Sequence, residues 1–140
     1  EMQDNITVAK GQVLPTAGKQ FTLVPDRMVG ASLQYAVGAF YARLKVKHTG
    51  RQYASLLNDE EVPAYTTGDF DAGYNFGNFG MLSNVQLRFN LSNITNAQYR
   101  NPSSGSVVNT VKYGSTNPST VYYYLGAPRY AAISLSADFK

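Results

Sequence analysis

Several short segments of the chain carry charged side chains, in part at every second position. These side chains could bind an anionic solute, or they could form ion pairs with one another. They are Arg43, Lys45, Lys47, Asp69, Asp71 and Arg88. Alternate positions of an extended strand face the same side, so the cations of one segment would form a row. Such a row could line a path for an anionic chelate. The nearby carboxylates favour pairing between neighbouring strands instead, and this structural interpretation is preferred.

Tyrosines in the last third of the chain offer a second kind of chemistry. Tyr99, Tyr113, Tyr122 and Tyr123 are candidates for substrate contact, and Tyr124 follows directly. An aromatic ring on a binding loop can stack on a sugar or a planar chelate, whereas rings near strand ends form a girdle at a membrane boundary. The girdle is the preferred interpretation for the tyrosines nearest the strands.

The scarcity of Cys and His argues against catalysis and against a tightly bound metal. The chain has no Cys and a single His, which excludes zinc–thiolate sites, disulfides and histidine clusters. The acidic run Asp59-Glu60-Glu61 could hold a divalent cation with its oxygen atoms, but a solvated loop cluster is preferred. No nucleophile lies near an evident base. We therefore expect no enzyme activity, no resident metal and no cofactor.

The composition limits the classes of protein to which the chain can belong. Only 15% of the residues are charged, 44% are hydrophobic, and the net charge is +3. These values argue against a disordered chain and against a nucleic-acid partner. No stretch approaches the roughly 18 to 20 apolar residues that a membrane helix needs. The polarity comes mainly from uncharged side chains, which is typical of sheet surfaces that do not all face water.

Alternation of apolar and polar residues predicts strands at residues 28–37, 40–47, 67–76, 85–92 and 130–139. Ile6 and Val8 hint at a further strand near the start of the chain. Each of the main segments is close to the length of a tilted membrane β-strand. We expect their apolar members to face lipid and the alternating neighbours to face the lumen of a barrel. The lipid-facing set comprises Val29, Leu33, Leu44, Val46, Leu87, Leu91, Ile133 and Leu135.

A tight turn at Val37-Gly38 is predicted to join the first of these segments to the second, with Gly38 supplying a positive φ. The expected register sets Ser32 beside Arg43 and pairs apolar with apolar residues on the other face. A second short turn is expected between Gly77 and Asn84. Both short turns fall at the same end of the sheet, and Phe139 is expected there too.

Long connections alternate with these short turns, at residues 11–27, 49–65 and 94–129. Short turns on one rim and long polar loops on the other are typical of an outer-membrane barrel. A soluble antiparallel sandwich also alternates, but its outer faces usually carry more Lys and Glu than this chain has. If substrate contact occurs within this chain, we expect it in the loops at 49–65 and 94–129.

Motifs in the correct order give the chain a family resemblance over about residues 20 to 140. Val24-Pro25-Asp26-Arg27-Met28 precedes one strand, and Val62-Pro63-Ala64-Tyr65-Thr66-Thr67 precedes Asp69-Phe70-Asp71-Ala72-Gly73-Tyr74. The most specific stretch runs from Val85 to Tyr99 as VQLRFNLSNITNAQY, and Gly126-Ala127-Pro128-Arg129 opens the last strand. The chain resembles the C-terminal barrel end of TonB-dependent outer-membrane receptors. It departs from that family in having Lys140 after the aromatic Phe139.

The resemblance implies an all-β fold, an antiparallel transmembrane β-barrel segment that supplies the last five or six strands of a barrel of about 22. Residues 1–140 would then be one C-terminal part of a receptor whose plug domain is absent from this chain. The implied location is the bacterial outer membrane. The implied function is energised import of a scarce nutrient, such as a ferric siderophore, a vitamin, a metal chelate or an oligosaccharide.

The resemblance also implies partners. These are outer-membrane lipid and lipopolysaccharide, the plug and other strands of the same receptor, and TonB through the absent N-terminal part. The barrel-assembly machinery would read the last strand, with Phe139 as the assembly signal. Two other functions remain open at this point. One is a passive porin-like barrel, and the other is a soluble antiparallel β-sandwich that binds carbohydrate.

Overall fold

The computed structural model describes residues 1–8, 11–103 and 107–139 of the chain, so Lys140 and its departure from the family pattern lie outside the described residues. Contact clustering divides the chain into two compact units. One, here called the sheet unit, contains Val29–His48, Thr66–Gln98 and Ala127–Lys140. The other, called the loop unit, contains Glu1–Met28, Thr49–Tyr65 and Tyr99–Gly126.

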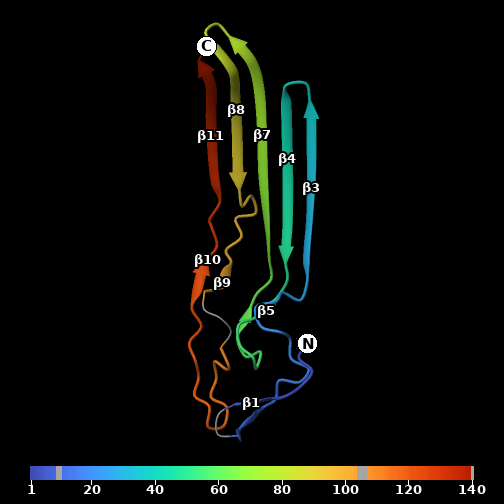
Figure 1. Ribbon diagram of the computed structural model, residues 1–140, viewed down its shortest axis with the longest axis vertical. Coiled ribbons are helices and arrows are strands. Elements are labelled where there is room, and N and C mark those ends of the chain that lie inside the picture. The colour runs from blue at the N-terminus through green and yellow to red at the C-terminus, as the bar shows by residue number, and fades with distance from the viewer. Residues whose placement is uncertain (9–10, 104–106, 140) are drawn as a thin grey trace. The chain divides into compact units, whose positions relative to one another are not determined.

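The sheet unit is built on one antiparallel sheet of five strands in the order β11-β8-β7-β4-β3 (Figure 1). The strands are β3 (Met28–Val37), β4 (Phe40–Thr49), β7 (Tyr65–Phe79), β8 (Leu82–Ser92) and β11 (Tyr130–Phe139). All five segments predicted from alternation are therefore strands, and β7 and β8 are longer than expected. The predicted all-β antiparallel fold is confirmed, and the sheet is open within this chain.

The register of the sheet keeps apolar and polar residues on opposite faces. Between β7 and β8, Phe70 pairs with Leu91 and Tyr74 pairs with Leu87, whereas Gly73 pairs with Arg88. The pairing of β11 with β8 follows the same rule and sets Ile133 against Phe89 and Ser134 against Arg88. Since side chains alternate with a period of two, agreement at these positions fixes the faces of all three strands.

Both hairpin turns differ in detail from the prediction. β3 ends at Val37 and β4 begins at Phe40, so the turn is Gly38-Ala39 rather than Val37-Gly38. Gly38 has φ 56°, as a short hairpin turn requires of one central residue. The pairing that follows is shifted by two residues from the predicted register. An even shift leaves every side chain on its predicted face, which is why alternation could not detect it.

The second turn is also tighter than predicted. β7 continues to Phe79 and β8 begins at Leu82, so most of the expected Gly77 to Asn84 turn is strand. A register shift falls between Asn75 and Gly77, which has φ 73°. Such a shift is a β-bulge, and the conformational freedom of glycine suits it to that position. The strand therefore continues through Gly77 and does not end there.

The apolar face of the sheet is open in this chain. Leu33 is 71% exposed, Ile133 is 73% exposed and Leu135 is 70% exposed. A sheet with one solvated face normally buries its apolar face against another layer. No helix in the described part of the chain is long and apolar enough to cross a membrane.

The loop unit contains the predicted long connections, and short strands form within them. Its described residues form three small antiparallel sheets: β1 (Ile6–Thr7) with β2 (Val13–Leu14), β5 (Gln52–Tyr53) with β6 (Glu61–Val62), and β9 (Arg100–Pro102) with β10 (Tyr123–Leu125). Its buried apolar side chains are Met2, Leu14, Ala54, Leu57 and Val62. The strand at which Ile6 and Val8 hint is present at Ile6–Thr7, but it is only two residues long and pairs with β2 within this unit rather than with the five-stranded sheet.

Candidate functional site

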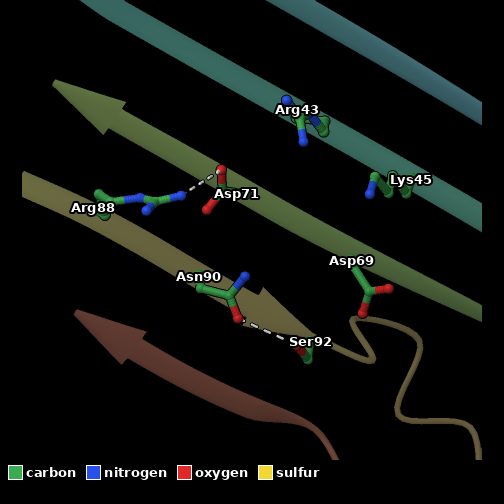
Figure 2. Close-up of a pocket in the computed structure, with 7 residues that line it drawn as sticks. All are labelled: Arg43, Lys45, Asp69, Asp71, Arg88, Asn90 and Ser92. Atoms are coloured by element: carbon green, nitrogen blue, oxygen red, sulfur yellow. Dashed lines mark hydrogen bonds and ion pairs between the residues drawn. The ribbon is translucent and has the colours of Figure 1, made fainter. Parts of the chain in front are cut away.

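The polar face of the sheet unit carries the candidate site. A cavity of about 380 Å³ lies on this face, across β4, β7 and β8 (Figure 2). Its lining consists of polar and charged side chains only: Arg43, Lys45, Asp69, Asp71, Arg88, Asn90 and Ser92. Most of the charged residues that the sequence singled out thus come together at one place. Lys47 is the exception and lies two residues further along β4, on the same face.

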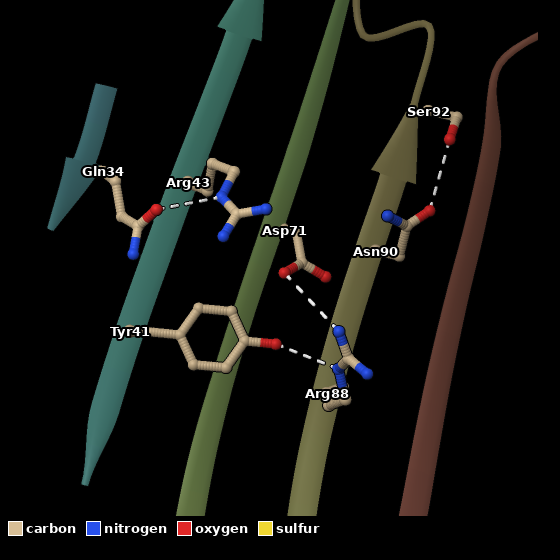
Figure 3. A network of polar contacts seen from close by, with 7 residues as sticks. All are labelled: Gln34, Tyr41, Arg43, Asp71, Arg88, Asn90 and Ser92. Atoms are coloured by element: carbon tan, nitrogen blue, oxygen red, sulfur yellow. Dashed lines mark hydrogen bonds and ion pairs between the residues drawn. The ribbon is translucent and has the colours of Figure 1, made fainter. Parts of the chain in front are cut away.

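Arg88 is the centre of a cross-strand network (Figure 3). Its Nη2 atom lies 3.9 Å from Asp71 Oδ1, and its Nε atom donates a hydrogen bond of 2.9 Å to the Tyr41 hydroxyl. Tyr41 reaches Arg88 across Gly73, where a Cβ atom would lie 2.7 Å from Cζ of the ring. The network joins β4, β7 and β8 and agrees with the predicted pairing for Arg88 and Asp71.

The cations of β4 are not paired in this way. Arg43 donates from Nε to Gln34 Oε1 at 3.2 Å (Figure 3), and this partner carries no charge. In the portion of the chain that the structure covers, neither Arg43, Lys45 nor Lys47 forms an ion pair with a carboxylate. The preferred interpretation, in which these cations pair with Asp69, Asp71 and neighbouring strands of the barrel wall, therefore stays a prediction for β4, and Asp69 and Asp71 line the same cavity as Arg43 and Lys45.

Asn93 is a structural residue that sequence reasoning did not single out. Its backbone N–H donates to Asp69 Oδ1 at 3.0 Å, and its Nδ2 donates to the carbonyl groups of Ala97 and Ala127. Its Oδ1 accepts from the Ala97 N–H and the Thr95 hydroxyl. Asn93 is 5% exposed and has φ 51°, a conformation that Asn tolerates better than most residues. Asn93 therefore fixes the conformation of the chain that follows β8. It belongs to the Val85–Tyr99 stretch, the most specific motif of the sequence.

The predicted substrate-binding tyrosines lie in the loop unit, and Tyr99 has an internal role there. Its ring stacks on Tyr65 with centroids 4.2 Å apart and an interplanar angle of 9°. A Cβ atom at Gly126 would overlap the same ring. The Gly126 N–H also donates to the Tyr99 carbonyl at 2.7 Å. Tyr99 therefore packs the start of β9 against the end of β10.

Tyr123 is also engaged internally. Its hydroxyl donates to Glu60 Oε1, and the Arg100 guanidinium lies over its ring, 4.4 Å from the centroid. Arg100 Nη2 is 3.6 Å from Glu60 Oε1. Burial and the hydrogen bond to the Glu60 carboxylate raise the pKa of Tyr123 to about 12, so the hydroxyl stays protonated at neutral pH.

Tyr113 and Tyr122 are the predicted contact residues with more accessible rings. Tyr122 is 66% exposed, and Tyr124, two residues further along the strand direction, is 71% exposed. Tyr113 is 39% exposed, and its carbonyl accepts a hydrogen bond of 3.0 Å from Gln12 Nε2. The structure therefore separates the tyrosines into internal and exposed members, a difference that their sequence positions do not reveal.

The acidic run at 59–61 lies at the surface, with Asp59 and Glu61 exposed and Glu60 half-buried, and each carboxylate also has a partner within the chain. Glu60 contacts Tyr123 and Arg100, as above, and Glu61 lies 3.9 Å from Arg51. Asp59 accepts hydrogen bonds from the Ser55 hydroxyl at 2.5 Å and from the backbone N–H groups of Thr110 and Val111 at 2.9 and 3.0 Å. No group of three or more metal-binding side chains occurs among the described residues.

Asp59 joins two connections that are far apart in sequence. Burial alone would raise its pKa, but the hydrogen bonds from Ser55, Val111 and Thr110 outweigh burial and lower the pKa below the usual 3.8. Main-chain hydrogen bonds add to the junction, from Leu56 N to Val107 O at 2.9 Å and from Val107 N to Ala54 O at 3.1 Å. Ser55 is fully buried at this junction.

Phe139 pairs with Leu82, beside the β7–β8 turn, and is 84% exposed. Figure 1 shows the end of the chain at that end of the sheet.

Long antiparallel strands, one apolar and exposed face, and a polar face with a charged cavity define a segment of a membrane barrel wall. The sequence agrees, because residues 4–94 match the family described as TonB dependent receptor-like, beta-barrel. The chain belongs to this family of outer-membrane receptors.

Solved structures of similar fold are receptors and transporters. The chain is 26% identical to BauA, the ferric preacinetobactin receptor from Acinetobacter baumannii, with a TM-score of 0.61 over 89% of this chain and 16% of that one. It is 20% identical to the siderophore receptor PiuA from Acinetobacter baumannii, with a TM-score of 0.67 over 94% of this chain and 16% of that one. It is 19% identical to the ferric citrate transporter FecA in the unliganded form, with a TM-score of 0.63 over 84% of this chain and 17% of that one.

The last two identities are low enough that these structures show the common fold alone. The chain spans about one sixth of the length of each of the three proteins. No curated protein sequence matches the chain.

Proposed function

We propose that this chain is part of the barrel wall of a larger outer-membrane receptor that imports a scarce nutrient with energy delivered through TonB. The observation that carries the proposal is the combination of family membership with an exposed apolar sheet face, on which Ile133 and Leu135 are 73% and 70% exposed. Lipid would cover that face, and the polar face would line the lumen. The plug domain and the segment that contacts TonB would lie in other parts of the receptor.

An iron chelate is the first solute to test, because BauA, one of the similar proteins, is a ferric preacinetobactin receptor. The experiment uses the complete receptor, expressed in a strain from which its gene has been deleted. Uptake of a panel of labelled ferric siderophores is measured under iron limitation, in cells with and without functional TonB. Fractionation checks that the receptor reaches the outer membrane.

The expected result is uptake of at least one chelate that needs both the receptor and TonB. A passive porin-like barrel, the second function from the sequence, would give uptake that persists without TonB. A receptor recovered in the soluble fraction would contradict the proposal outright. The sandwich alternative has no support from the structure, because no second layer covers the apolar face within the residues described.

A further inference from the structure

The side chain of Gln12 joins two segments of the loop unit that are far apart in sequence. Its Nε2 atom donates a hydrogen bond of 3.0 Å to the carbonyl of Tyr113, 101 positions further along the chain. Its Oε1 atom accepts from the Ser115 hydroxyl at 2.6 Å and from the Thr116 hydroxyl at 3.0 Å. Both polar atoms of this amide are therefore used, and all three hydrogen bonds end on residues 113–116.

Residues 113–116 form a tight turn that leaves room for this amide. Tyr113 and Thr116 exchange two main-chain hydrogen bonds, at 3.1 and 2.9 Å. Gly114 has φ 57°, and a Cβ atom on it would lie 2.3 Å from Gln12 Nε2. Any other residue would be strained in this left-handed conformation and would also displace the amide. Gly114 is therefore what allows Gln12 to approach the turn.

The segment that precedes the turn is held by other groups. Asp59 accepts two of its main-chain N–H groups, as described above. The buried Asn109 donates from Nδ2 to the Val111 carbonyl at 2.8 Å and to the Thr116 carbonyl at 3.4 Å. Without Gln12, the longer of these two hydrogen bonds would tie the turn to its base.

Gln12 also supplies the direct polar link between the first and the last part of the loop unit. Among the residues that the structure describes, the hydrogen bonds that join residues 1–28 to residues 107–126 all involve its side chain. Other links between these two parts run through residues 49–65, for example at Asp59 and at Asn58, which exchanges hydrogen bonds with Gln20. Loss of one side chain would thus free the turn and leave its base attached.

We propose that Gln12 is a releasable clasp that fixes the 113–116 turn to the first part of the loop unit. The clasp consists of neutral hydrogen bonds from one half-buried side chain, whereas the junction at Asp59 contains a carboxylate. Hydrogen bonds to a charged group are the stronger kind, so the turn opens before its base does. The clasp thereby sets the position of Tyr113, one of the predicted contact residues.

Trypsin cleavage after Lys112 measures release of the clasp in the complete receptor in detergent. Lys112 is exposed and directly precedes the turn, and a protease attacks a segment in its opened form, so the cleavage rate follows the population of the released turn. Gln12→Ala should raise this rate about tenfold, which corresponds to the loss of one or two neutral hydrogen bonds. Gln3→Ala is the matched control, because Gln3 is an exposed glutamine in residues 1–28, and it should leave the rate unchanged.

Gly114→Ala tests the same contact from the other side. It should also raise the rate of cleavage after Lys112, because the added methyl group strains the turn and displaces the Gln12 amide. In the Gly114→Ala background, Gln12→Ala should then have little further effect, since the contact between the two residues is already lost.

An unchanged rate of cleavage after Lys112 in Gln12→Ala would overturn the clasp. So would an equal effect of Gln12→Ala with and without Gly114→Ala, because Gln12 would then act somewhere other than at the turn. Cleavage after Lys19 is measured in the same digests. An equal rise there would also overturn the clasp, since the change would have unfolded residues 1–28 rather than released the turn. The assay needs no transported solute, so these outcomes do not depend on the proposed function.

Discussion

The ring of Tyr41 on β4 lies over Gly73 on β7, and the Tyr41 hydroxyl continues to Arg88 on β8. A Cβ atom at Gly73 would lie 2.7 Å from Cζ and 2.8 Å from the hydroxyl oxygen of Tyr41. Gly73 is buried by this contact, and the hydrogen bond from Arg88 holds the ring in place. The absence of a side chain on β7 is therefore what allows three neighbouring strands to share one polar network.

Gly73→Ala should disrupt this contact in the complete receptor. The added methyl group must displace the Tyr41 ring, and overpacking of this kind costs about 1–3 kcal/mol. Gly30→Ala is the matched control, since a Cβ atom there would meet only the Val46 carbonyl at 3.7 Å. The melting temperature of both variants is measured in detergent, with unfolding monitored by the heat-modifiable electrophoretic mobility of the barrel. Equal melting temperatures for the two would show that the contact is not tight.

The face assignment of β4 predicts a contrast between two neighbouring positions. Leu44 and Lys45 are adjacent and point to opposite faces. Leu44→Arg places a charge on the proposed lipid face, at a cost of about 2–4 kcal/mol near the membrane midplane. Lys45→Gln should leave assembly unchanged. The amount of folded receptor in the outer membrane is the measurement, and equal amounts of the two variants would contradict the assignment.

Asn93 provides a third prediction. Asn93→Ala removes several hydrogen bonds made by a buried side chain and places Ala at φ 51°. Leaving buried carbonyl and N–H groups unpaired costs about 1–3 kcal/mol each. Asn96→Ala is the control, because Asn96 has a similar φ of 50° but an exposed side chain. We expect a lower unfolding temperature for Asn93→Ala than for Asn96→Ala. The opposite order would contradict the conclusion that the Asn93 side chain stabilises the chain after β8.

Alternation along the sequence was sufficient to predict the faces of the sheet but not its fine register. Its period of two cannot distinguish a turn at Val37-Gly38 from one at Gly38-Ala39 when the pairing changes by an even number. The loop contacts were beyond prediction for another reason. Asp59 and Thr110 are 51 positions apart, and neither belongs to a periodic segment. Only the folded chain shows that Asp59 has backbone partners and that Tyr99 and Tyr123 are engaged internally.

Asp59 predicts a pH-dependent junction in the loop unit. Its pKa in the folded protein is lower than in the unfolded chain, so its contribution to stability is complete above the usual value near 3.8. That contribution is lost as the pH falls through the lower, folded pKa. Limited proteolysis of the complete receptor should therefore cut near Thr110 and Val111 faster at pH 3 than at pH 7.

Asp59→Ala should cause the same faster cleavage already at pH 7, because it removes the acceptor of both backbone N–H groups. Glu61→Ala is the control, since Glu61 is about half exposed and its Arg51 partner lies 3.9 Å away. Exposed ion pairs of this kind contribute little. Cleavage at the same rate in both variants would argue that the main-chain bonds alone hold the junction.

Substrate contact, if the loop unit provides it, should involve Tyr122 rather than Tyr99 or Tyr123. A ring can stack on a planar solute only if its face is free, and Tyr122 is 66% exposed. Tyr99 is covered by Tyr65 and Gly126, and Tyr123 is held by Glu60 and Arg100. Tyr122→Ala in the complete receptor should reduce affinity for the transported solute about fivefold, equivalent to about 1 kcal/mol for one aromatic contact. The amount of the Tyr122→Ala receptor in the outer membrane should equal that of the unmodified receptor.

Tyr99→Ala separates binding from folding in the same assay. This change removes packing between β9 and β10, so its main effect should be less folded receptor and faster proteolysis of the loop unit. Remaining folded Tyr99→Ala receptor should bind the solute with nearly unchanged affinity. If Tyr122→Ala leaves affinity unchanged while Tyr99→Ala reduces it at equal receptor levels, the division into internal and exposed tyrosines does not predict contact. Binding would then have to be assigned to other parts of the receptor or to the polar face of the sheet.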